Sequence, residues 1–401
     1  MTKKFYELTP DERLALLTID DDVRAALSEQ QSTVNAQLVE NYISDFRVPI
    51  GVVRDLLINR QHYQVPMATE EPSVIAAANN GAKMLSAGID VQIGRTAMIG
   101  QMMFVTEKSL ADYVQAHRLE ILDIARQARP SIYQRGGGLL DVVVRQVSEN
   151  ETSVDFIIDT QDAMGANIVD TILEAELPLF ESFHPLGVIL SNYATQQLVT
   201  ATADIAFERV GGEHVARQIV ALNHFAQSDP YRATTENKGL FNGASAVVLA
   251  TGNDWRAVEA SGHAYASRNG QYQALTTWSI KNNQLHGELT MPISVGTVGG
   301  AISVLPAAQN GLAILGHVNA DELRMVIVSV GLAQNLAALK AIVSGGIQQG
   351  HMRMQYRALA MQVGAEVDEV KRLVPRLMAE KHVDTELATK ILMEIRNESK
   401  S

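Results

Sequence analysis

Cysteine is absent from the 401 residues of this chain. Without a thiol, the chain can form no disulfide, thiolate metal site or iron–sulfur cluster, and it has no covalent thiol nucleophile. Long apolar runs are also missing, because no uninterrupted stretch approaches the roughly 18–20 residues of a membrane span. The first residues lead into a helix-start pattern rather than the apolar core of a signal peptide. We therefore expect a soluble, cytoplasmic protein with no membrane partner.

Positive charge is scarce as well, with 33 Lys and Arg against 45 Asp and Glu and a net charge of −12. A protein that coats nucleic acid needs a basic face to displace counterions, so we expect no nucleic-acid partner. Hydrophobic residues at 46% and charged residues at 19% are ordinary globular values, which exclude general disorder. The length allows two or three domains.

The common catalytic and nucleotide-binding motifs do not occur in this sequence. It contains no G-x-G-x-x-G, no P-loop, no G-x-S-x-G and no H-E-x-x-H. The triplet Gly136 to Gly138 precedes an expected strand, which favours a flexible turn over a dinucleotide fingerprint. The ten histidines show no tight metal-ligand spacing, so we expect no metal site. General motifs alone indicate only a soluble multidomain α/β protein.

Several segments have clear helical patterns. Residues 9–45 are typical of short polar helices, because Thr9 can cap the first helix and a proline follows it. The run of small residues at 74–78 indicates a helix that can pack very closely. The segment 321–343 predicts a helix that stops at glycine. After Gly350 the pattern is that of an amphipathic helical tail, which we expect to be a mobile C-terminal element.

The composition changes near residue 92. A strand-like pattern covers 91–106, and a charged helix is expected at 108–128. Two β-rich runs, 139–147 and 154–158, are separated by a short polar turn, which predicts a hairpin. The resulting β-α-β-β-α order predicts a compact α+β insert with its own small sheet.

Nine short segments of the chain are distinctive when they are taken together. They are residues 40–47, 65–78, 162–167 (D-A-M-G-A-N), 229–234, 236–239 (E-N-K-G), 250–260, 291–292 with 298–300, 331–336 and 350–352. In this order they resemble hydroxymethylglutaryl-coenzyme A reductase of the class II, soluble bacterial type. The resemblance spans residues 40–352, and a helical tail of the right length follows.

The resemblance implies an α+β fold in three parts. A large, discontinuous, mostly helical domain for substrate binding and dimerisation would comprise residues 1–92 and 200–346. A small α+β domain for the nicotinamide cofactor would be inserted at 93–199, and a C-terminal helical flap would follow at 347–401. The family's sites lie at a subunit interface, so the resemblance implies a homodimer or a higher homo-oligomer.

The implied reaction is the four-electron reduction of 3-hydroxy-3-methylglutaryl-CoA to mevalonate and coenzyme A by two NAD(P)H. Lys238 matches the catalytic lysine, which brings positive charge and a transferable proton to the developing oxyanion. Asp254 matches an aspartate that would hold the ammonium, and Glu71 would share that site and donate a proton. His351 would protonate the departing thiolate. Since no cysteine is present, hydride must attack the bound carbonyl directly.

Each of these four residues also has a plainer interpretation. Lys238 could be a solvated loop lysine, Asp254 part of a turn, and His351 a surface residue. A carboxylate just before the helix expected at 74–88 would be stabilised by the dipole of that helix. That interpretation suits Glu70 well, so we assign catalysis to Glu71 alone.

The same resemblance implies residues that bind the free carboxylate and the reacting end of the substrate. Arg232 is the natural bidentate partner of that carboxylate, and Ser73 is a short hydrogen-bond donor. Asn242 matches a side chain near the reacting carbonyl or Lys238. Alternatively, Ser73 could cap a helix and Asn242 could belong to a turn.

The cofactor site would be built on the segment 162–167 and on Asn192. A strand–loop–helix with a glycine lets backbone N–H groups approach phosphates at a helix N-terminus. An aspartate cap with a glycine turn would explain the same segment. The resemblance implies contacts from these side chains and this glycine: Asp162, Met164, Gly165, Asn167 and Asn192.

Cofactor choice is expected to depend on Arg129. NAD-linked members of the class carry an acidic residue at the matching place, where it can accept from the ribose 2′-hydroxyl. An arginine there favours a 2′-phosphate, hence NADPH and biosynthetic mevalonate production over NAD-linked breakdown. A surface arginine near a helix C-terminus is the alternative.

Two other hypotheses for the function of the whole chain stay open. One is a non-catalytic paralogue that binds acyl-CoA, and the other is a nicotinamide enzyme that acts on another acyl-CoA.

Overall fold

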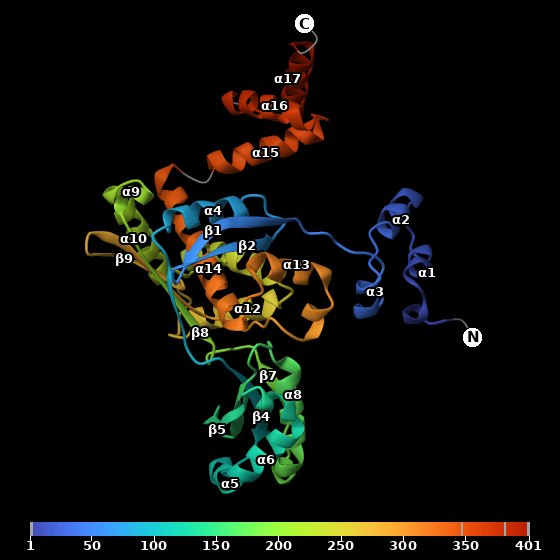
Figure 1. The fold of residues 1–401 in the computed structure, drawn as a ribbon, viewed down its shortest axis with the longest axis vertical. Coiled ribbons are helices and arrows are strands. Elements are labelled where there is room, and N and C mark those ends of the chain that lie inside the picture. The colour runs from blue at the N-terminus through green and yellow to red at the C-terminus, as the bar shows by residue number, and fades with distance from the viewer. Residues whose placement is uncertain (1–2, 346–347, 381, 399–401) are drawn as a thin grey trace.

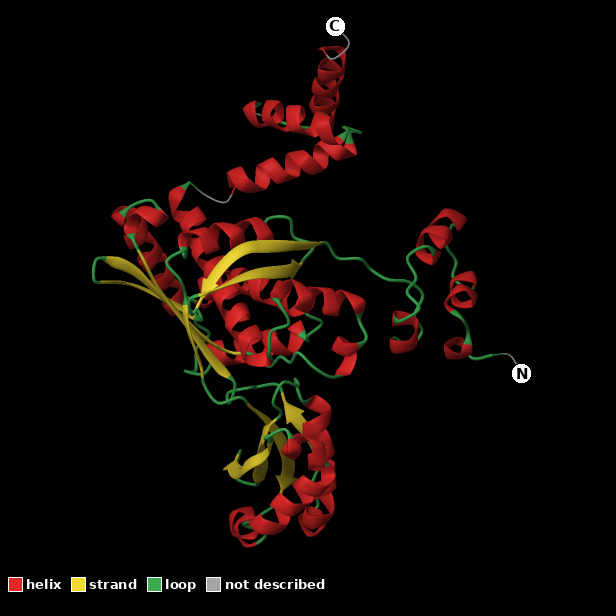
Figure 2. Cartoon of the chain, in the orientation of Figure 1, coloured by secondary structure: helices red, strands yellow, loops and turns green. Residues whose placement is uncertain are grey.

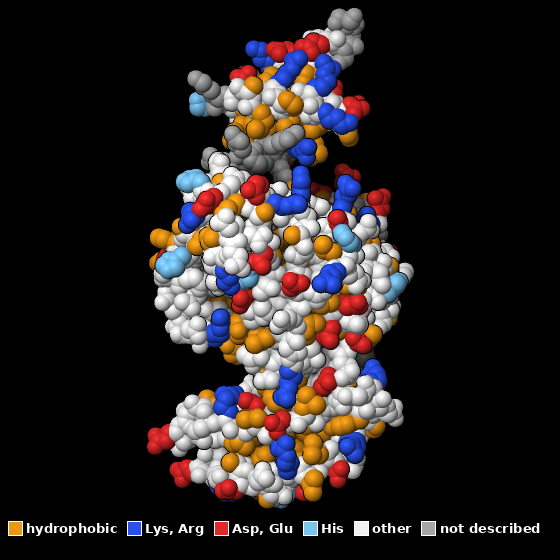
Figure 3. All heavy atoms as spheres, turned by 60° about the vertical axis from the view of Figure 1, so that its left-hand side comes forward, with side chains coloured by type: hydrophobic (Ala, Val, Ile, Leu, Met, Phe, Trp, Pro, Cys, Tyr) orange, Lys and Arg blue, Asp and Glu red, His pale blue; other side chains and the backbone are white. Residues whose placement is uncertain are grey.

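The computed structural model describes residues 3–345, 348–380 and 382–398. Figure 1 shows a central body, a small lobe below it, a group of C-terminal helices above it, and an N-terminal arm to one side. Helices and sheets are both extensive (Figure 2), and the predicted α+β class is confirmed. Figure 3 shows a constriction where the small lobe meets the central body.

The N-terminal arm, residues 3–46, consists of short helices as the polar pattern predicts. Thr9 caps α1 in a capping box, since its Oγ1 accepts from the Glu12 N–H at 3.2 Å and the Glu12 carboxylate accepts from the Thr9 N–H at 2.7 Å. The elements are η1 (Phe5–Glu7), α1 (Pro10–Ala15), α2 (Asp21–Ser28) and α3 (Asn35–Leu38). An extended stretch leads from the arm to the central body (Figure 1).

The central body is built on a four-stranded antiparallel sheet and a separate hairpin. The sheet has the order β3 (Asp90–Ile93), β8 (Leu198–Ile205), β10 (Gln284–Pro292) and β9 (Thr276–Lys281). The hairpin pairs β1 (Ile50–Ile58) with β2 (Gln61–Ala68). The helices of the body are α4 (Val74–Met84), α9 (Phe207–Val210), α10 (Glu213–Ser228), α11 (Pro230–Ala250), α12 (Trp255–Ala266), η3 (Gly300–Ser303), α13 (Pro306–Leu315) and α14 (Ala320–Ser344).

Helix α14 is the central helix of this core. By length and composition it could cross a membrane, but 72% of its most apolar window is buried inside the protein, as is typical of a core helix. Helix α4 packs directly against it, and a Cβ on Gly81 would lie 2.0 Å from the carbonyl oxygen of Ala333. The predicted close packing of the small-residue helix is therefore confirmed.

The small lobe, residues 97–191, has its own antiparallel sheet and its own core. The sheet order is β5 (Gly138–Gln146), β6 (Glu151–Asp159), β4 (Ala97–Val105) and β7 (Gly187–Ser191). Its helices are α5 (Leu110–Ala116), α6 (Arg118–Ala128), α7 (Pro130–Gln134), α8 (Ala166–Glu176) and η2 (Leu177–Phe183). The predicted hairpin is confirmed as β5 and β6, and the buried side chains include Phe104, Phe156, Ile172 and Phe180.

Two details of the lobe differ from the sequence-based expectation. The strand-like run at 91–106 forms two strands in different sheets, because residues 94–96 carry the chain from the body to the lobe. The expected helix at 108–128 is interrupted at His117, whose φ of −104° and ψ of 13° are not helical. Continuous apolar or charged patterning does not reveal such breaks.

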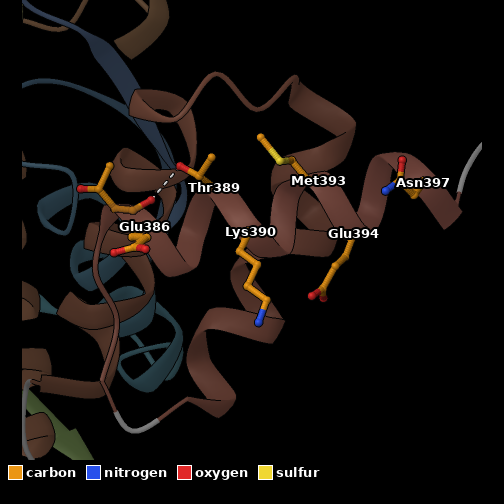
Figure 4. A pocket seen from close by; sticks show the side chains of 7 residues that line it. Glu386, Thr389, Lys390, Met393, Glu394 and Asn397 are labelled. Carbon is orange, nitrogen blue, oxygen red and sulfur yellow. Dashed lines mark hydrogen bonds between the residues drawn. The ribbon is translucent and has the colours of Figure 1, made fainter.

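The C-terminal helices are α15 (Gln348–Gln362), α16 (Val367–Ala379) and α17 (Thr385–Glu398), and they share a separate apolar cluster. The Arg396 guanidinium lies 2.8 Å from the Glu369 carboxylate and lowers the pKa of Glu369 to about 2. An open depression of about 710 Å³ lies on α17 (Figure 4), and no predicted site residue lines it. The expected flap boundary at 346/347 lies outside the described residues.

Candidate active site

One cavity of about 510 Å³ brings together five of the predicted site residues. It lies where the N-terminal end of α4, helix α11 and helix α14 meet, and we call it the lysine cavity. The predicted residues that line it are Glu71, Ser73, Arg232, Lys238 and Asn242. Arg232, Lys238 and Asn242 come from α11, and Glu71 and Ser73 come from the turn that precedes and begins α4.

The Glu71 carboxylate accepts hydrogen bonds from several side chains that line this cavity. Its Oε2 accepts from Lys238 Nζ at 2.9 Å and from Asn242 Nδ2 at 3.3 Å. The Ser73 hydroxyl donates to Glu71 Oε1 at 3.1 Å. Lys238 and Asn242 reach the same carboxylate because a spacing of four residues places them on one face of α11. The Lys238 side chain is 63% exposed, so the pair is open to a ligand.

Arg232 is held at the wall of the cavity by Glu236, one turn later on α11. The Arg232 Nη2 lies 3.2 Å from Glu236 Oε2, and the two side chains are only 15% and 1% exposed. Arg232 Nε is buried and has no hydrogen-bond partner among the described residues. The guanidinium therefore keeps a donor that no described protein group uses, and the residue lines the cavity.

Glu236 was not predicted as a site residue, although it belongs to the E-N-K-G segment. Its Oε1 accepts from Asn223 Nδ2 at 2.7 Å, from Thr276 Oγ1 at 3.2 Å and from Asn335 Nδ2 at 3.3 Å. Trp278 Nε1 in turn donates to Asn335 at 2.8 Å. A buried carboxylate needs charge pairing and hydrogen bonds. Here Oε1 accepts from neutral donors, while Oε2 is ion-paired with Arg232 and has no hydrogen-bond partner among the described residues.

Asp254 does not line the lysine cavity. Its Oδ1 caps α12 by accepting from the backbone N–H groups of Arg256 at 2.9 Å and Ala257 at 3.2 Å, and its Oδ2 lies 3.2 Å from the Arg256 guanidinium. It lines a second cavity, of about 400 Å³, together with Met164, Gly165 and Asn167. We call this second space the loop cavity.

The loop cavity has the features of an anion site. Gly165 precedes α8 with a φ of +99°, and no side chain caps this helix N-terminus. A Cβ at Gly165 would lie 2.3 Å from Thr160 Cγ2, so only glycine fits. Free N–H groups at the start of a helix bind phosphate, and the residues present therefore fit a dinucleotide.

Arg135 also lines the loop cavity and was missed by the sequence analysis. It directly precedes the glycine triplet, in which Gly136 and Gly138 have φ values of +91° and +116°. The triplet forms the turn that was expected, and this turn leaves Arg135 exposed beside the cavity. A lone arginine before a turn carries no sequence signal that distinguishes it from any surface arginine.

Three predicted cofactor residues do not line the loop cavity. The Asp162 carboxylate accepts from the Ala320 N–H at 3.0 Å, at the start of α14. Arg129 Nη2 donates to the Asn167 carbonyl at 3.4 Å, and its buried Nε has no hydrogen-bond partner among the described residues. Asn192 is exposed after β7.

The fourth predicted catalytic residue, His351, falls within α15, but its side chain lies outside the described part of the chain. Among residues 3–345, 348–380 and 382–398, no group of three or more His, Asp or Glu side chains could hold a metal ion. The described site is therefore composed of two polar cavities, one around Lys238 and one around the turn before α8.

Comparison with known proteins decides the family. The sequence profile of hydroxymethylglutaryl-coenzyme A reductase matches residues 9–356. The chain belongs to this family. Its members are NAD(P)H-dependent oxidoreductases, so the resemblance inferred from the nine segments and the expected enzyme class are both confirmed.

Individual reductases resemble the chain over most of its length. The 3-hydroxy-3-methylglutaryl-coenzyme A reductase of Archaeoglobus fulgidus is 38% identical, and the alignment covers 98% of this chain and 94% of that protein. A solved reductase from Streptococcus pneumoniae is 43% identical with a TM-score of 0.77, covering 98% of this chain and 99% of that one. A second structure from S. pneumoniae, described as a class II reductase bound to NADPH in open conformations, is 44% identical with a TM-score of 0.76, covering 96% and 99%.

Proposed function

We propose that this chain reduces 3-hydroxy-3-methylglutaryl-CoA to mevalonate and coenzyme A with NADPH, in the biosynthetic direction. The observation that carries the proposal is the Lys238–Glu71 pair in one cavity with Arg232 and Ser73, in a chain of this family. The class II reductase from S. pneumoniae is described as bound to NADPH, which supports the same cofactor here. Two NADPH molecules would each supply one hydride, one to each reduction step.

Lys238 would stabilise the oxyanion that forms when hydride reaches the bound carbonyl. Glu71 keeps the ammonium in place through its 2.9 Å contact and can return a proton to it between the two steps. Arg232 and Ser73 would hold the distal carboxylate of the substrate. His351 would protonate the leaving thiolate.

The separation of the two cavities supports a homodimer whose sites lie between subunits. Asp254 lines the loop cavity, whereas Lys238 and Glu71 line the lysine cavity. In this arrangement the loop cavity of one subunit would face the lysine cavity of its partner. The N-terminal arm exposes apolar side chains, including Phe46 at 90% and Leu16 at 66%, which a second copy would cover.

We propose that three parts of the chain have different roles. The parts at 1–92 and 200–346 would bind the acyl-CoA and form the dimer, the part at 93–199 would bind the nicotinamide cofactor, and 347–401 would close over the site as a flap. Exclusion of water during the two hydride transfers is the purpose of such a flap. We propose a cytoplasmic location, in keeping with its soluble substrates.

The decisive experiment is a spectrophotometric assay of the purified chain with 3-hydroxy-3-methylglutaryl-CoA and NADPH or NADH. We expect NADPH oxidation and a loss of about 10²-fold or more in kcat for Lys238→Ala, as for other lost oxyanion donors. Lys281→Ala, at an exposed strand end, is the matched control. A folded sample that oxidises neither cofactor but binds the acyl-CoA would instead support a non-catalytic binding protein.

A further inference from the structure

The segment at residues 293–298 follows β10, has no regular structure, and runs from the interior of the protein to an exposed end at Val298. We call it the strap. Residues 293–296 are buried, yet they belong to no strand or helix. Buried backbone N–H and C=O groups need hydrogen-bond partners, so other parts of the protein must supply them.

Arg324 of α14 supplies two of these partners. It is 1% exposed, and its Nε and Nη2 donate to the carbonyl oxygens of Ile293 at 3.2 Å and Val295 at 3.1 Å. Its Nη1 donates to Asp321 at 2.7 Å. Burial lowers the pKa of Arg324, while the charges of Asp321 and Asp162 oppose that shift.

Asn253 ties the strap to the turn that carries Asp254. The Gly296 N–H donates to Asn253 Oδ1 at 2.8 Å. The Asn253 Nδ2 donates to the carbonyl and the hydroxyl of Thr251 at 3.3 and 3.2 Å, so the amide is fixed from both ends. Asn253 is 8% exposed, and it directly precedes Asp254 in the wall of the loop cavity.

The strap also holds the loop at residues 162–167. The Asp162 carbonyl accepts from the Thr297 N–H at 2.8 Å. Ala163 and Val298 form an isolated parallel bridge. A Cβ on Gly296 would lie 2.3 Å from the Met164 nitrogen, so the two backbones touch at this glycine. The Asp162 carboxylate adds its contact with the Ala320 N–H at the start of α14.

We propose that the strap sets the position of the 162–167 loop relative to Asp254, with Asn253, Gly296 and Arg324 as positioning residues for hydride transfer. One buried segment carries contacts to both walls of the loop cavity, and α14 anchors it. A movement of either wall is thereby transmitted to the other. This inference rests on the proposed function only for its effect on catalysis, because the coupling of the two walls is a property of the fold.

The first test replaces Gly296 by alanine, which adds a Cβ against the Met164 nitrogen. Gly187→Ala is the matched control, since a Cβ there meets nothing within 4 Å. We expect Gly296→Ala to lower kcat by about 10- to 100-fold, as for small misplacements of reacting groups. The KM for 3-hydroxy-3-methylglutaryl-CoA should change less than about threefold, because the strap does not line the lysine cavity. Gly187→Ala should behave as wild type.

The second test measures amide hydrogen exchange in the full chain for Asn253→Ala and Gly296→Ala. Asn253→Ala should raise exchange in residues 160–168, and Gly296→Ala should raise it in residues 250–257. The proposal would be overturned if exchange rose only in the residues next to each substitution, and not in these distant regions, and if Gly296→Ala kept the wild-type kcat. If the wild type shows no reductase activity, the proposed function fails, and the exchange data still decide whether the strap couples the two walls.

Discussion

At the scale of single residues, α11 separates two kinds of charged group. Lys238 is exposed and paired with Glu71, so it can meet a substrate, whereas the Glu236 side chain is only 1% exposed and its Oε1 accepts from a buried protein group. Arg232 lies between these two environments, with one nitrogen near Glu236 and another without a partner among the described residues. The buried carboxylate therefore sets the direction of the guanidinium.

Replacement of Glu236 by glutamine tests this role. The glutamine Oε1 can keep the three neutral donors, but its NH₂ group faces the guanidinium, where donor meets donor. We expect the KM for the acyl-CoA to rise about 10-fold or more with kcat changed less than about threefold, since charged hydrogen bonds are involved. Steady-state kinetics decide it, with the exposed Glu288→Gln as control. An equal loss in kcat would contradict a role confined to substrate binding.

Glu176 is a buried carboxyl that the proposed mechanism does not use. It is 0% exposed in the small lobe, and neither oxygen has a hydrogen-bond partner among the described residues. Burial, with a smaller contribution from the charge of Glu120, raises the pKa of Glu176 to about 8 from 4.5. The native lobe therefore holds this group neutral at pH 7, whereas the unfolded chain ionises it.

The pH dependence of stability follows from that difference. The contribution of Glu176 to the stability of the folded protein is fully present below about pH 4.5 and is lost as pH rises to about 8. Over this range the folding equilibrium constant falls by up to tenfold for each pH unit. Between pH 5.5 and pH 8, the denaturant concentration at the unfolding midpoint should therefore fall more for the wild type than for Glu176→Gln. Glu174→Gln, exposed on the same helix, should keep the wild-type slope. Identical slopes in all three proteins would refute a buried neutral Glu176.

At the scale of elements, the N-terminus of α8 and the turns around it line the loop cavity, which we propose binds the cofactor. Gly165 leaves the helix N-terminus uncapped, Arg135 lines the cavity, and Arg129 contacts the Asn167 carbonyl. Either guanidinium could neutralise a 2′-phosphate. Arg129 is the residue that the sequence indicates, and Arg135 is the one that the cavity indicates.

Two substitutions separate these arginines. We expect Arg129→Ala to raise the KM for NADPH about 10-fold and leave the KM for NADH unchanged, because only NADPH carries the 2′-phosphate. If Arg135→Ala instead raises the KM for NADPH alone, and Arg129→Ala changes neither KM, then Arg135 is the residue that binds the 2′-phosphate. Equal or better use of NADH by the wild type, unchanged in Arg129→Ala, would refute the assignment to Arg129.

At the scale of the whole molecule, the arm and the lobe extend from different sides of the body (Figure 1). The arm stands apart and exposes Leu16, Val39 and Phe46 at 66%, 54% and 90%. Apolar side chains of this kind gain stability when a second chain covers them.

Deletion of residues 1–46 tests the role of the arm in assembly. The proposed dimer predicts that the shortened chain is a monomer in light scattering and loses turnover, because the loop cavity of one subunit would no longer face the lysine cavity of its partner. Circular dichroism should show that the remaining helices and sheets are intact. A shortened chain that stays dimeric and active would show that the arm is dispensable.

Several features of this protein were determined by the sequence alone. The lack of cysteine closes the covalent thiol route, and the spacing of four residues places Lys238 and Asn242 on one face of a helix. The nine segments were sufficient for the family, and the hairpin and the cap at Thr9 follow from local rules. The domain boundaries and the roles of the site residues stay predictions.

Only the tertiary structure decided which distant groups meet. Glu71 reaches Lys238 across 167 positions, Asp254 lies with the 162–167 loop instead, and Asp162 turns toward α14. Helix α14, which is long and apolar enough to cross a membrane, lies mostly buried in a core, and a segment without regular structure contacts two walls of one cavity. Local patterns follow from the geometry of neighbouring residues, whereas these contacts depend on how whole elements pack, which no short stretch of sequence specifies.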